Sequence, residues 1–138
     1  MERVDVETRC KLIGAMTCHE ARMRDLQCLR MSPSKRRHAA DEFGNSLVEE
    51  ILIVLSDDSV AWQDSQRCTL HLADCKSHVD RERFWVEVGG SCCWDYSLRG
   101  KRENVAGKSI VFVLVWLCWL RHVQPDAFVH ECTFLFVD

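Results

Sequence analysis

Two adjacent cysteines, Cys92 and Cys93, lie in the glycine-flanked segment GGSCCWDYSLRGKR, residues 89–102. A thiol becomes a nucleophile when it loses its proton, and the basic residues later in this segment favour the charged thiolate. A second reactive group, the carboxyl group of Glu131, follows an apolar segment further along the chain. A thiolate and a carboxylic acid that face one cavity can act as nucleophile and general acid on the same substrate.

The segments that flank these residues predict a strand, a helix and a second strand. Residues Phe84–Val88 favour a strand that ends at a glycine pair, which can adopt turn geometries that other residues avoid. The apolar run that begins at Ile110 suits a buried helix of about fourteen residues, with Ser109 as its N-cap. Residues Ala127–His130 predict the second strand. Such a βαβ unit has parallel strands, so we expect the two reactive residues that follow the strands to converge at one edge of the sheet.

Within this frame the chain resembles the cytosine-C5 DNA methyltransferases, whose nucleophile loop reads approximately G-G-x-P-C-Q-x-F-S-x-x-G-K-x. Residues 89–102 follow that pattern position by position and have Cys93 at the nucleophile position. The family's second motif, an apolar strand that ends in E-N-V, is similar to residues 128–133, which contain Glu131. The other loop positions that the resemblance assigns to the substrate are Ser97, Gly100, Lys101 and Arg102.

The resemblance implies a particular reaction. The Cys93 thiolate would add to C6 of cytosine and activate C5 toward methylation, while Glu131 would stabilise or protonate the ring at N3. The implied methyl donor is S-adenosylmethionine, and the resemblance implies that Asp74 contacts its adenine or flanks its site. The implied partner is DNA, from which the target base is extruded. RNA is the alternative partner, because a related branch with similar motifs modifies tRNA.

The same resemblance implies an α/β fold, a partial Rossmann-like methyltransferase fold whose βαβ unit covers about residues 84–133. We expect the partial catalytic domain to occupy residues 46–138, and a divergent or flexible, partly helical region to occupy residues 1–45. Cys92 replaces a proline that stiffens the family's loop. The family's glycine-rich donor turn has no counterpart near residues 31–45. We therefore expect a fragment or divergent member with little or no methyl transfer by the isolated chain.

The composition is ordinary for a globular protein, with 47% apolar and 28% charged residues. The net charge of −3 gives no general attraction to polyanions, so any nucleic-acid contact must come from a local patch. Nine cysteines without a secretory signal suggest free thiols, metal ligands or a nucleophile in a reducing compartment. We expect an intracellular, nuclear location. The apolar run after Ile110 is too short for a membrane crossing, so we expect no membrane partner.

The first forty residues carry weaker signals. Val6, Cys10 and Ile13 repeat with a weak helical period. Residues 31–38 contain Pro33 and a basic cluster, which is typical of an exposed linker. A nuclear import signal or a phosphate contact is the alternative interpretation of that cluster.

Two further functions compete with methyl transfer. The spacing Cys68-x-x-His71-x-x-x-Cys75-x-x-His78 supplies two thiols and two imidazoles, the ligands of a tetrahedral zinc site. We expect this tract to form one helix, from which four ligands could hardly surround one ion. The other competitor is a non-catalytic domain that kept the methyltransferase fold and lost the reaction.

Overall fold

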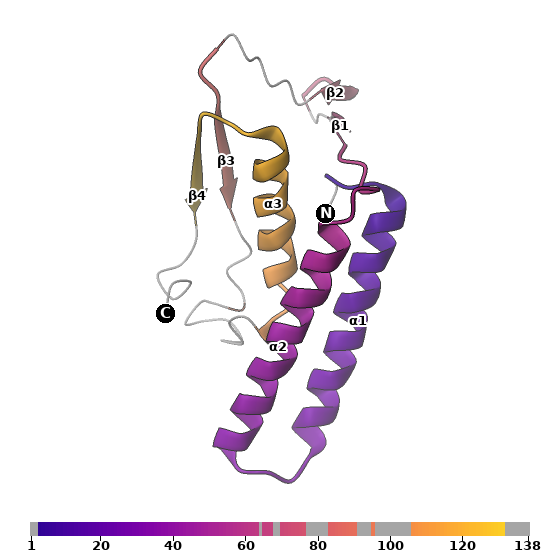
Figure 1. Cartoon of the computed structure of the whole chain (residues 1–138), viewed down its shortest axis with the longest axis vertical. Helices are drawn as coiled ribbons and strands as arrows, with labels where there is room; N and C mark the ends of the chain where they lie inside the picture. Colours follow the sequence, from indigo (N-terminus) through magenta and orange to yellow (C-terminus); the bar gives the residue numbers. More distant parts are fainter. Residues whose placement is uncertain are drawn as a thin grey trace.

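A computed structural model of the chain shows a mixed α and β architecture in which one helix separates a helical hairpin from a small sheet (Figure 1). Helix α3 lies between the hairpin of α1 and α2 and the sheet of β3 and β4 (Figure 1). The structure describes residues 3–63, 65–67, 70–76, 83–90, 95 and 106–131.

The N-terminal region consists of two 23-residue helices, α1 (Val6–Cys28) and α2 (Pro33–Leu55), and is therefore more regular than the sequence patterns predict. The segment 31–38, predicted as a linker, instead contains the start of α2. Ser32 caps this helix, with its hydroxyl accepting a hydrogen bond from the Lys35 N–H, and Pro33 takes the first helical position, where its missing N–H costs nothing. The expected division at residue 45 falls inside α2.

The residues of α1 that repeat in the sequence lie on its exposed side. Val6 and Ile13 are 68% and 47% exposed, and Cys10 is exposed too. The buried side of α1 is partly polar, and its members are Thr8, Leu12, Ala15, His19 and Leu26. The expectation of a partly helical N-terminal region is thus met, while the residues that show the weak helical period do not form the buried side.

Helix α3 (Ile110–Val123) is the centre of the core and has the fourteen residues that the apolar run predicts. Eight of its residues are buried, because α2 packs on one side and the sheet lies on the other. A helix that is covered from several directions must be apolar around most of its surface. Leu47, Ile51 and Leu55 of α2 meet α3 in this core. No helix among the described residues is both long and apolar enough to span a bilayer.

The predicted βαβ unit is confirmed in its topology. Strand β3 (Val86–Gly90) precedes α3 in the sequence and strand β4 (Ala127–Glu131) follows it. The two strands pair in parallel, with Val86 opposite Ala127 and Gly90 opposite Glu131. The glycine pair belongs to β3, and neither glycine has a positive φ. The predicted turn role of this pair is therefore wrong.

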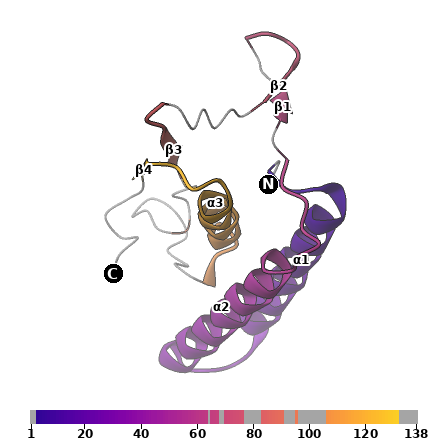
Figure 2. The same ribbon diagram turned by 45° about the horizontal axis from the view of Figure 1, so that its top comes forward.

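The tract that contains the predicted zinc ligands is a β-hairpin, so the expectation of a single helix is wrong. Strands β1 (Ser65–Arg67) and β2 (Asp74–Lys76) pair antiparallel, with Gln66 opposite Cys75. In both views this hairpin lies apart from β3 and β4 (Figures 1 and 2).

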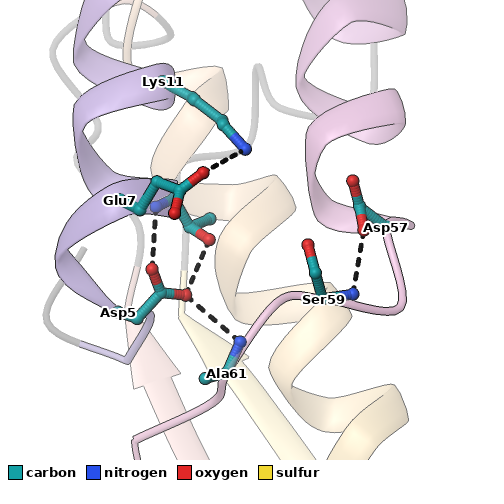
Figure 3. Close-up of polar contacts among 7 residues, drawn as sticks. Asp5, Glu7, Lys11, Asp57, Ser59 and Ala61 are labelled. Atoms are coloured by element: carbon teal, nitrogen blue, oxygen red, sulfur yellow. Dashed lines mark hydrogen bonds and ion pairs between the residues drawn. The ribbon is translucent and has the colours of Figure 1, made fainter.

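The start of α1 is tied to the segment after α2 by the carboxylate of Asp5 (Figure 3). Asp5 accepts hydrogen bonds from the Thr8 N–H at 2.9 Å, the Thr8 hydroxyl at 2.7 Å and the Ala61 N–H at 3.1 Å. These bonds, with the Thr8 N–H first among them, lower the pKa of Asp5 from its ordinary 3.8 to about 2. Asp5 is thus both the N-cap of α1 and a clamp between the two ends of the helical hairpin.

Replacing Asp5 with asparagine is expected to make the thermal stability less dependent on acid pH. The depressed pKa stabilises the fold above about pH 4, and this contribution is lost as the pH falls toward 2. At pH 7 we expect the Tm of Asp5→Asn to lie about 3–5 °C below wild type, and the difference to vanish near pH 2. Thermal scans from pH 7 to pH 2 test this, with Glu49→Gln on the exposed side of α2 as the matched control.

Candidate functional site

The carboxylate of Glu131 lies at the carboxyl edge of the β3–β4 sheet, as predicted. Glu131 pairs with Gly90 in the last position of the register, and its Oε2 is 3.3 Å from where a Cβ on Gly90 would stand. The side chain is exposed, and no ion pair involves it within the described residues. Glu131 is therefore a free carboxyl group beside the point where the chain leaves β3 toward Cys93.

The side of the sheet that faces α3 is filled by an aromatic stack. The Trp116 indole lies 4.8 Å from the His130 ring, nearly parallel to it, and meets Phe128 edge-on. A Cβ on Gly89 would come within 2.5 Å of the same indole. Gly89 is thus required for close approach of α3 to the sheet, and not for an unusual backbone conformation. His130 and Glu131 point to opposite faces because neighbouring residues alternate along a strand.

Asp95, in the middle of the predicted nucleophile loop, holds the start of α3. Its carboxylate is 3% exposed and accepts a hydrogen bond of 3.0 Å from the Ser109 N–H. Ser109 is the N-cap residue of α3, as predicted, but its hydroxyl makes no capping bond, and the Asp95 carboxylate takes that part instead. Gly107 packs against the Asp95 carboxyl group so closely that a Cβ there would collide with it. The pattern D-Y-S in the sequence gave no hint of this capping role.

Cys93 lies outside the described residues, as do Ser97, Gly100, Lys101 and Arg102. Covalent geometry nevertheless limits its distance from the described anchors. Two peptide links separate it from Asp95 and three from Gly90, which allows Cα distances of at most about 8 Å and 11 Å.

Asp74 belongs to a different part of the structure. It begins β2 and is exposed, in the hairpin that lies apart from the β3–β4 sheet. The structure does not bring Asp74 to Glu131, and the assignment of Asp74 to the methyl donor stays a prediction.

The expected position of the donor's glycine-rich turn is occupied by helix. Residues 33–45 belong to α2, and Gly44 is buried in the interface of that helix. A glycine-rich turn cradles a ligand with backbone N–H groups that a helix interior uses for its own hydrogen bonds. The described residues therefore do not fit S-adenosylmethionine at this position.

His71 and Cys75 form the one predicted metal-ligand pair that the structure describes. The His71 Nδ1 lies 3.1 Å from the Cys75 Sγ, across the turn between β1 and β2. Among the described residues no group of three or more potential ligands surrounds one point. Cys68 and His78 lie outside the described residues.

The other described cysteines have different surroundings. Cys10, Cys18 and Cys28 are exposed free thiols on α1. Burial raises the pKa of the Cys118 thiol, with a smaller opposing effect of Arg121, so Cys118 is less reactive than an ordinary thiol.

Comparison with known proteins leaves the family open. No protein-family model, curated protein or solved structure matches this chain. Among the residues predicted to act in catalysis, the structure describes the position of Glu131, and it also describes Asp95 from the predicted nucleophile loop.

Proposed function

We propose that this chain carries the pyrimidine-binding half of a cytosine-C5 methyltransferase-like centre on a partial Rossmann-like fold. The observation that carries the proposal is the pairing of Gly90 with Glu131 at the carboxyl edge of parallel strands. This pairing supports the proposal, because Glu131 lies opposite Gly90, the last residue of β3, and Cys93 follows Gly90 by three residues in the sequence. Asp95 anchors the other side of the same loop to α3.

The chemistry assigned to this chain is the reversible activation of cytosine. The Cys93 thiolate forms a bond to C6, and the electron pair of the C5–C6 double bond moves toward C5 and the N3 side of the ring. Glu131 donates its proton to N3, so the adduct is neutral and C5 becomes electron-rich. Reversal breaks the S–C6 bond and returns the proton to Glu131. The base must leave the helical stack for this addition, which favours a nucleic acid with an extruded cytosine as substrate.

We assign no step to the methyl donor, because the described residues do not supply its cradle. Methyl transfer to C5 is the step that S-adenosylmethionine would complete in a full enzyme. The isolated chain is expected to give no methyl transfer with a labelled donor and cytosine-containing DNA.

The proposal is tested by a donor-independent trap. Duplex DNA with 5-azacytosine at one position presents a more electrophilic C6, which a thiolate attacks without any methyl donor. Incubation with the full chain is expected to give a covalent protein–DNA adduct, and peptide mass spectrometry is expected to place it on Cys93. The same DNA with unmodified cytosine is the control. Absence of the adduct in DNA and in RNA of the same sequence would favour a non-catalytic domain.

A second candidate function, zinc binding, is favoured by the contact between His71 and Cys75. The objection that the ligands lie along one helix does not hold for His71 and Cys75, because His71 lies in the turn of the β1–β2 hairpin and Cys75 in β2. Elemental analysis of the purified chain is expected to find about one zinc per chain if the site exists. Cys75→Ser is then expected to lower the zinc content at least tenfold, and Cys10→Ser on α1 to leave it unchanged.

A further inference from the structure

The tip of the helical hairpin concentrates positive charge in a chain that is acidic overall. Residues 22–38, here called the cationic tip, contain a single acidic residue, Asp25. Their basic residues are Arg22, Arg24, Arg30, Lys35, Arg36 and Arg37. The chain has 18 basic and 21 acidic residues, so the rest of it holds 12 basic against 20 acidic residues. The opposite signs of the tip and of the remainder give the molecule a strong charge asymmetry.

The fold gathers these charges at one end of the molecule. Helix α1 ends and α2 begins at the same end of the antiparallel hairpin, and this end projects away from the strands (Figures 1 and 2). The basic residues lie within two turns of the connection, which corresponds to about 10 Å of helix on each side. A stretch that is continuous in sequence thus becomes a compact, protruding surface.

The charges of the cationic tip are available to a partner. Five of the six basic side chains are exposed. The sixth, Arg36, is half-buried and donates a hydrogen bond to the Leu29 carbonyl at 3.0 Å. Within the described residues, no ion pair involves any of the six. The N-terminus of α2, capped by Ser32, adds its positive partial charge to the same end. Self-repulsion among such charges is relieved when an anion binds.

We propose that the cationic tip binds the phosphate backbone of a nucleic acid. The charges are spread over an end of the hairpin that projects away from the strands, which suits an extended polyanion better than a small anion. Leu29, which is 53% exposed, is the only exposed large apolar residue of the cationic tip. Helices that bind a membrane surface present a broad apolar face instead. The choice of a nucleic acid as partner rests on the proposed function. The positive charge of the cationic tip can attract the phosphates of DNA, which the negative net charge of the whole chain does not.

The inference is tested by binding of a fluorescent duplex to the full chain. Lys35→Gln with Arg37→Gln removes two exposed charges and keeps helix-compatible side chains. At about 0.1 M salt this variant is expected to bind roughly 10–60-fold more weakly, and the slope of log K against log salt is expected to fall by roughly 2. The matched control, Lys11→Gln with Arg121→Gln, removes the same charge from other helices and is expected to change the affinity less than threefold. Circular dichroism of both variants confirms equal folding.

The arms of the experiment separate the possible outcomes. Equal weakening by the tip variant and its control would overturn the inference, because the effect would then follow net charge alone. Binding to vesicles with anionic lipids in the absence of binding to duplex DNA or an RNA hairpin would overturn it as well. Tip-dependent binding without an azacytosine adduct would thus reject the proposed function and keep the inference, and the reverse result would reject the inference alone.

Discussion

Cys93→Ser is expected to abolish the covalent adduct with azacytosine DNA, with a fall in its rate of at least about 10³-fold. A serine hydroxyl has a far higher pKa than a thiol, so almost none of it is ionised at pH 7 and it attacks C6 poorly. The side chain keeps nearly the same size, so folding is expected to be unchanged. The measurement is the rate of adduct formation on a denaturing gel, with the thermal midpoint of the variant as a check on its fold.

The neighbouring cysteine provides a matched control for this result. Cys92→Ser makes the same chemical change one position earlier and is expected to retain adduct formation within a few-fold of wild type. Glu131→Gln removes the proton donor and keeps the shape, so the adduct rate is expected to fall by about 10²–10³-fold. If Cys92→Ser were as damaging as Cys93→Ser, the register of the nucleophile would be wrong. If Glu131→Gln had no effect, the carboxyl group would have no part in the reaction.

Gly107→Ala is expected to destabilise the protein by about 2–4 kcal/mol and to slow the adduct reaction as well. The new Cβ would collide with the buried Asp95 carboxyl group, which must move and lose its hydrogen bond to Ser109. Because Asp95 is two residues from Cys93, the same movement displaces the reactive loop. Urea unfolding of the variant measures the stability, and the azacytosine trap measures the rate at a temperature where the variant stays folded.

A double-mutant cycle with Asp95→Gly isolates this contact from other effects of the extra methyl group. Asp95→Gly removes the three atoms nearest to the new Cβ, so adding Gly107→Ala in that background is expected to cost less than about 1 kcal/mol. Gly14→Ala on α1 is the matched control, since nothing lies within 4 Å of a Cβ at that position. It is expected to be neutral or slightly stabilising. Equal costs of Gly107→Ala in both backgrounds would show that Asp95 is not the neighbour that matters.

The βαβ unit could be predicted because its signals are local. A strand that ends in two glycines, an apolar run of helical length and a second short strand follow one another, and the handedness of such connections leaves little choice of topology. The position of Glu131 at the sheet edge followed from that topology. The anchoring of the loop by Asp95 did not, because it depends on the approach of a buried side chain to the start of a helix fourteen residues away.

The helical hairpin shows the opposite case. The buried face of α1 includes Thr8 and His19, and the Nε2 of His19 lies 2.5 Å from the Ala106 carbonyl oxygen. A search for apolar residues at helical spacing cannot find a buried face that contains polar residues. The partner of His19 is also 87 residues away in the sequence. The cationic tip could not be predicted from the sequence either. Pro33 is typical of a loop, and only the structure shows that it is the first residue of α2.

The sequence by itself determined the order and type of the last three elements and the residues that their ends present, since periodicity and chain direction are local properties. The tertiary structure decided which side of α1 is buried, that Cys75 and His71 meet across a hairpin, and that six basic residues share one exposed end of the molecule. The buried side of α1 depends on contacts with segments far along the chain, whose energies no single window of residues contains. The other two outcomes depend on where the chain reverses direction, between β1 and β2 and between α1 and α2.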